Sequence, residues 1–124
     1  MDYKRAKKFI IDNLSRDIRF HEEGKFDEIG KGYAEYDNEF PRTDHQLMIA
    51  WNFWDAWIDE RNHGFPCFYS GITKETWPQL AKHIIEKLSK GEKITDPLIL
   101  SNFVFERKPS LIERIKKFFK KRTT

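Results

Sequence analysis

Three tryptophans within one short segment, Trp51, Trp54 and Trp57, constrain the fold of this chain more than any other feature. They lie in residues 44–63, where apolar side chains occupy nearly the whole circumference of a helix. A helix that is apolar on almost every side has to be surrounded by other elements. We therefore predict a central helix over this segment, ended by Gly64, with the tryptophans in the core.

Helices are also predicted on both sides of this segment. Apolar residues at spacings of three and four indicate helices over residues 2–23 and 76–89, and the second begins with Thr-Trp-Pro-Gln, which matches a capping box. An Asp-Pro pair at 96–97 indicates a short helix that continues to Phe103, although the apolar run after it also fits a strand. Residues 65–72 contain Pro and Gly and form a loop or one short extended segment near 65–70. The predicted fold class is mainly α, a compact fold of four or five helices.

The length of 124 residues suits a single domain, which we place at 1–124. The one cysteine, Cys67, has no partner for an internal disulfide or a cysteine zinc site, and we expect it to be a buried structural thiol. No apolar stretch is long enough to cross a bilayer, and no secretory signal is visible at the start of the sequence. These features indicate a soluble, cytoplasmic protein without a transmembrane segment.

The net charge of +3 is distributed unevenly. Residues 1–8 carry +3, residues 9–106 carry −7 and residues 107–124 carry +7. Within the last region, residues 110–122 are predicted to form a basic amphipathic C-terminal helix. The candidate partner-binding residues on it are Arg114, Lys117, Phe118 and Lys121.

Such a helix has two uses that the sequence leaves open. It can bind an anionic membrane surface or the groove of a protein partner. It can also pack on the acidic body of its own chain, with its lysines in solvent. Nucleic acid is not an expected partner, because no recognisable binding signature accompanies the basic run and the acidic body would repel a duplex.

A polar stripe remains on the central helix at spacings of three and four, formed by Asn52, Asp55, Asp59 and His63. Two carboxylates and an imidazole on one face suit a metal ion or acid–base chemistry. The stripe lacks the second liganding helix that metal sites in helical bundles use, and a solvated face explains the same spacing. We therefore predict no metal, no cofactor and no catalytic residue.

These features favour a non-enzymatic interaction protein, acting through aromatic surface or through the basic C-terminal helix. Its partner is a second copy of the chain, another protein or an anionic surface. The alternative is a small-ligand-binding protein or an enzyme that uses Asp55, Asp59 and His63 beside the tryptophan-rich helix. A pocket that opens onto these three side chains would favour the alternative.

Overall fold

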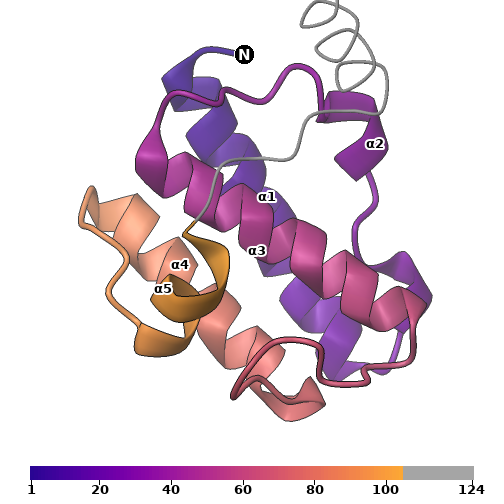
Figure 1. The fold of residues 1–124 in the computed structure, drawn as a ribbon. Helices are drawn as coiled ribbons and strands as arrows, with labels where there is room; N and C mark the ends of the chain where they lie inside the picture. The colour runs from indigo at the N-terminus through magenta and orange to yellow at the C-terminus, as the bar shows by residue number, and fades with distance from the viewer. Residues whose placement is uncertain (105–124) are drawn as a thin grey trace, which may run out of the picture.

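The protein is mainly helical, as the sequence predicts. The computed structural model describes residues 1–104 and contains no strand in that range. In Figure 1, α3 crosses the middle of the molecule with α1 behind it, while α4 and α5 lie on one side and α2 on the other. The five helices of these residues are α1 (Tyr3–Glu22), α2 (Tyr33–Tyr36), α3 (His45–Asn62), α4 (Trp77–Lys90) and α5 (Pro97–Phe103), with 3-10 turns η1 (Phe26–Glu28) and η2 (Lys74–Thr76). The helix predicted over 110–122 lies outside the described residues.

The ends of the helices follow local chemistry. Asp2, Asp44 and Asp96 precede α1, α3 and α5, and each carboxylate accepts a hydrogen bond from a backbone N–H two or three residues later. These bonds satisfy N–H groups that have no partner inside the helix. Gly91 ends α4 in the left-handed conformation, with φ at 68°. The predicted starts of α3 and α5 and the predicted end of α4 are confirmed.

The predicted capping box at residues 76–79 is wrong, although α4 begins close to the expected place. The Thr76 hydroxyl turns back toward η2. It donates to the Thr73 carbonyl at 2.9 Å and accepts from the Thr73 N–H at 3.0 Å. The preceding 3-10 turn therefore uses the hydroxyl that the capping-box pattern assigns to α4.

Of the two alternatives predicted for residues 65–72, the structure has the loop and no extended segment near 65–70. Phe65 and Cys67 have φ of 60° and 65°, in the left-handed region that side chains other than glycine rarely adopt. The carboxylate of Glu60 accepts hydrogen bonds from the N–H groups of Cys67 and Phe68, at 3.2 and 2.6 Å. The loop consequently folds back on the end of α3, and a helix residue supplies the bonds that a strand would have made.

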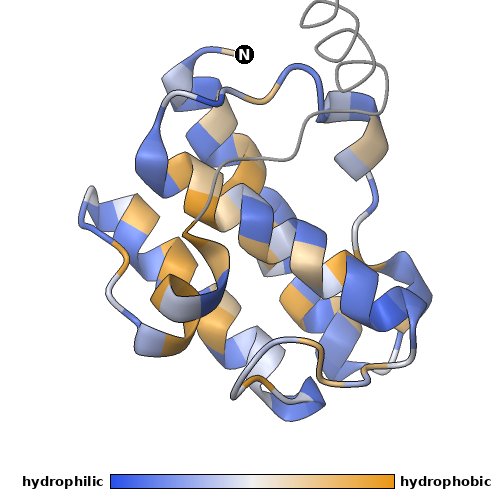
Figure 2. Cartoon of the chain, viewed as in Figure 1, coloured by the Kyte–Doolittle hydropathy of each residue, from blue (hydrophilic) through white to orange (hydrophobic). Residues whose placement is uncertain are grey.

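The core of the described residues is aromatic. Trp51, Trp54, Trp57 and Trp77 are each at most 1% exposed, which confirms the predicted burial of the first three. Trp57 and Trp77 stack between α3 and α4, with ring centroids 6.1 Å apart and planes at 8°. Hydrophobic sides of the helices face one another, and the outer sides are mostly hydrophilic (Figure 2). Helix α3 contacts α1, α4 and α5, so it is the central helix that the tryptophans predict.

Candidate functional site

The polar stripe of α3 is divided between the interior and the surface. Asn52 is 3% exposed, and its side-chain N–H donates to the Phe103 carbonyl at 3.3 Å. Asp55, Asp59 and His63 are exposed. Asn52 therefore joins α3 to the end of α5, and only the other three stripe residues are open to a ligand or a partner.

The two exposed carboxylates lie between two tyrosines from other segments. Tyr33 of α2 is bonded through its hydroxyl to Asp55, and burial together with the Asp55 charge raises the pKa of Tyr33 well above its usual value. Burial and the nearby charges of Asp59 and Asp55 raise the pKa of Tyr69 to about 12. We call Asp55 and Asp59, flanked by Tyr33 and Tyr69, the acidic face of α3.

His63 makes local contacts at the end of this face. Its Nδ1 lies 2.8 Å from the backbone carbonyl oxygen of Asp59 and 3.6 Å from a carboxylate oxygen of the same residue. The ring meets Phe68 edge-on, with centroids 5.3 Å apart. Within residues 1–104, no three His, Cys, Asp or Glu side chains are grouped in a way that could hold a metal ion. The exposed part of the stripe is an open acidic surface.

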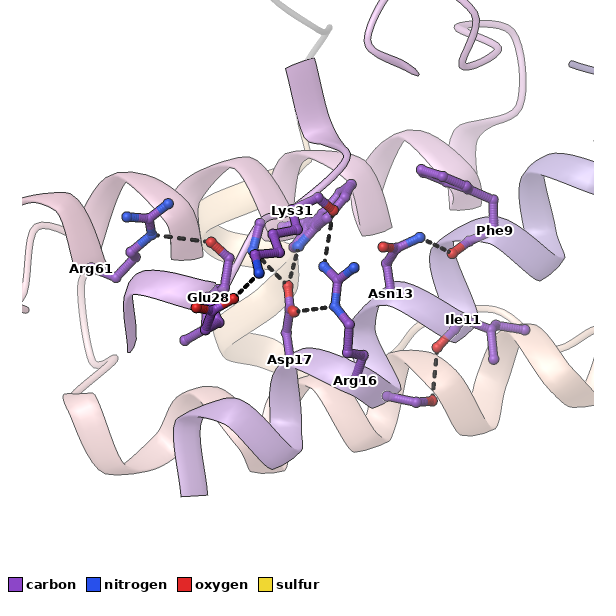
Figure 3. A network of polar contacts seen from close by, with 12 residues as sticks. Phe9, Ile11, Asn13, Arg16, Asp17, Glu28, Lys31 and Arg61 are labelled. Carbon is purple, nitrogen blue, oxygen red and sulfur yellow. Dashed lines mark hydrogen bonds and ion pairs between the residues drawn. The ribbon is translucent and has the colours of Figure 1, made fainter. Parts of the chain in front are cut away.

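The sequence interpretation missed a buried carboxylate on α1. Asp17 is fully buried and accepts hydrogen bonds from the Trp54 indole N–H at 2.7 Å and the Gly30 N–H at 2.9 Å. Arg16 adds an ion pair at 2.9 Å and donates to the Lys31 carbonyl at 2.9 Å (Figure 3). The carboxylate thereby ties α1 to α3 and to the segment before α2.

His21 has a similar role one helical turn later. The indole N–H of Trp57 donates to its Nδ1 at 3.2 Å, and its Nε2 lies 2.7 Å from the Lys74 carbonyl oxygen. Because an indole can only donate, Nδ1 has to accept, and Nε2 carries the proton that is donated to Lys74. Burial lowers the pKa of His21 and outweighs the hydrogen bond to the Lys74 carbonyl, which raises this pKa, while the positive charge of Lys74 lowers it further.

A sequence signal for both residues exists. Asp17 and His21 are four residues apart on α1, and their partners Trp54 and Trp57 are three apart on α3. A buried indole N–H needs an acceptor. Polar residues at helical spacing on the neighbouring apolar face are therefore candidates for that acceptor.

Cys67 is exposed, so the prediction of a buried thiol is wrong. The reason is the turn that Glu60 imposes on the loop. Glu60 is 1% exposed and binds the backbone at Cys67 and Phe68, which leaves the side chains of these two residues on the surface.

The exposure of Cys67 predicts that its thiol reacts readily with Ellman's reagent in the folded protein. One thiol per chain is expected to react without denaturant, because access to the sulfur does not require unfolding. The release of thionitrobenzoate measures the reaction, and Cys67→Ser serves as the blank. A thiol that reacts only after denaturation would contradict the loop conformation.

A shallow hollow of about 190 Å³ lies between α1 and α2. It contains none of the stripe residues, and it is lined by Met1, Arg5, Lys8, Phe9, Asp12 and Tyr36.

No helix within residues 1–104 has the length and apolar character needed to cross a membrane. No protein-family model, curated protein or solved structure matches the chain.

Proposed function

We propose that this chain is a non-enzymatic interaction protein that binds anionic membrane surfaces through its basic C-terminal segment, residues 107–124. One observation favours this segment over an aromatic surface as the binding site. The four tryptophans are packed inside the helical body, together with Phe53 and Phe103. The only large hydrophobic side chains exposed by more than a third in the described residues are Tyr3, Phe68, Leu100 and Val104.

The composition of the segment suits a lipid surface. It carries +7 and interleaves its basic residues with Leu111, Ile115 and Phe118 at spacings of four and three. Basic side chains near an anionic membrane each contribute about 1 kcal/mol of attraction, and apolar residues on the same helix face enter the boundary with the acyl chains. Nucleic acid would use the charge and leave the apolar residues without a role.

The open position of Asp55, Asp59 and His63 supports an interaction protein over the alternative of an enzyme or small-ligand binder. A catalytic or ligand site encloses its substrate and removes it from water. Asp59 and His63 have side chains that are 50% and 56% exposed. This face suits recognition of another charged surface better than chemistry on a small molecule.

Binding of the full chain to vesicles tests the proposal. We expect sedimentation with vesicles containing phosphatidylserine and none with neutral phosphatidylcholine vesicles. Lys117→Glu with Lys121→Glu should weaken binding by at least about tenfold, because each substitution removes one attractive charge and adds a repulsive one. Phe118→Ala, which keeps the charge, should weaken binding by several fold.

The matched control reverses two lysines on the body, Lys82→Glu with Lys90→Glu, which are exposed on α4. This control makes the same change in net charge and should retain vesicle binding. If both double variants lost vesicle binding equally, the overall charge alone would explain the loss, and the proposal would be contradicted. Tight binding to duplex DNA that is insensitive to Phe118→Ala would assign the segment to nucleic acid instead.

A further inference from the structure

The described chain ends beside the acidic face of α3. Phe103 closes α5, and its carbonyl accepts the hydrogen bond from Asn52 of α3 at 3.3 Å. Asp55 follows Asn52 by three residues, a rise of about 4.5 Å along the helix. Arg107 and Lys108 follow Phe103 by four and five residues, so the chain can carry both at most about 18 Å from this contact. The first cations of the basic segment are therefore tethered within reach of Asp55.

The acidic face attracts cations for two physical reasons. Asp55 and Asp59 are exposed carboxylates four residues apart on a helix, a spacing at which like charges repel each other. Asp59 also lies in the last turn of α3, where the helix dipole already places negative partial charge. A bound cation relieves both effects. Tyr69, which is close enough to feel the charges of Asp59 and Asp55, also packs against Phe103 with ring centroids 5.3 Å apart, so the end of α5 lies on the same side as these carboxylates.

We propose that the acidic face of α3 binds the chain's own basic segment, residues 107–124, and holds it away from membranes. The role of the membrane as a competitor rests on the proposed function, whereas the docking itself depends only on charge and on where the described chain ends. A segment tethered this closely has an effective concentration in the millimolar range, so a weak contact is well populated. Docking in this way makes the membrane affinity of the segment depend on the body.

The single exposed cysteine offers a direct test in the full chain. Cys67 lies in the loop that carries Tyr69, and Glu60 at the end of α3 binds its backbone N–H. A nitroxide spin label on Cys67 broadens the NMR signals of nearby amides. We expect strong broadening in residues 107–124 at low ionic strength, and much weaker broadening in 0.5 M salt, where charges are screened.

Asp55→Asn with Asp59→Asn should abolish the broadening in residues 107–124. Asparagine keeps a carbonyl oxygen that can accept the Tyr33 hydrogen bond, so the fold is expected to survive, and unchanged amide signals in residues 1–104 check this. The matched control, Glu86→Gln with Glu92→Gln, removes two exposed carboxylates that are paired with lysines of α4. This control should retain the broadening.

Three results would overturn the proposal. They are a lack of broadening in the unmodified sequence at low salt, broadening that persists in the Asp55→Asn, Asp59→Asn variant, and broadening that arises only between molecules. A mixture of spin-labelled unenriched chain with unlabelled ¹⁵N-enriched chain detects the last case. In that case the acidic face would bind the basic segment of a second copy of the chain and not its own. No vesicle is present in these experiments, so their outcome is separate from that of the proposed membrane binding. If both proposals hold, Asp55→Asn with Asp59→Asn should raise the vesicle affinity about three- to tenfold.

Discussion

Trp54→Ala is expected to lower the free energy of unfolding by about 3 to 5 kcal/mol, the largest loss we predict for a single substitution. The indole is fully buried, and its removal leaves a cavity between α1 and α3. It also takes a hydrogen-bond donor from Asp17, a carboxylate without access to water. Urea unfolding followed by circular dichroism measures the effect.

Trp54→Phe separates the two contributions. Phenylalanine keeps most of the apolar volume but cannot donate to the Asp17 carboxylate, so about 1 to 3 kcal/mol of the loss should remain. Tyr3→Ala is the matched control, because Tyr3 is an aromatic residue that is 50% exposed. The free energy of unfolding of Tyr3→Ala should differ from that of the unmodified sequence by less than about 0.5 kcal/mol. A Trp54→Ala midpoint as little affected as that of Tyr3→Ala would contradict the role of Trp54 in the core.

The sequence was sufficient to predict α1, α3, α4 and α5 because each has a strong local signal, whereas the single turn of α2 has none. The tryptophan-rich segment has the composition of a surrounded helix, and Asp44, Asp96 and Gly91 stand where caps and stops are needed. The predictions that are wrong, the capping box at 76–79 and the buried thiol of Cys67, depend on hydrogen bonds that the spacing of apolar residues does not reveal. The loop at 65–70 takes its shape from Glu60, and Thr76 bonds backward to Thr73.

The candidate site was predictable only in part, for the same reason. Spacing on one helix places Asp55, Asp59 and His63 on a common exposed face, as observed. It could not show that Asn52 is covered by α5, because that requires knowing where α5 crosses α3. The two tyrosines that border the carboxylates come from other parts of the chain, and periodicity carries no information about such contacts.

The second large effect that we predict is a loss of stability at acidic pH that originates at His21. The folded protein holds this imidazole neutral, since Nδ1 accepts the Trp57 N–H and Nε2 donates to the Lys74 carbonyl. Protonation places a second N–H opposite the indole N–H and breaks that bond. Lys74 lies close and opposes the new charge, while Glu22 and Glu75 offset part of this opposition.

The direction of the pH effect follows from the lowered pKa of His21 in the folded state. Below the usual pKa of about 6.5, the unfolded chain binds a proton that the folded chain does not, so the free energy of unfolding falls as the pH falls. The stability that the neutral His21 contributes is fully present above pH 6.5. It is lost as the pH falls from this value to the pKa that His21 has in the folded protein. Each unit between the two pKa values corresponds to about 1.4 kcal/mol.

His21→Phe isolates this contribution. The variant keeps an aromatic ring but cannot titrate or form the two hydrogen bonds, so it should be less stable than the unmodified sequence at pH 7.5 and lose less on acidification to pH 5. Urea midpoints measured at intervals across this range give both profiles. All other groups are common to the two proteins, so their contributions cancel in the difference. Parallel profiles would mean that the pKa of His21 is the same in the folded and the unfolded chain, which would contradict the hydrogen bond from Trp57 to a neutral imidazole.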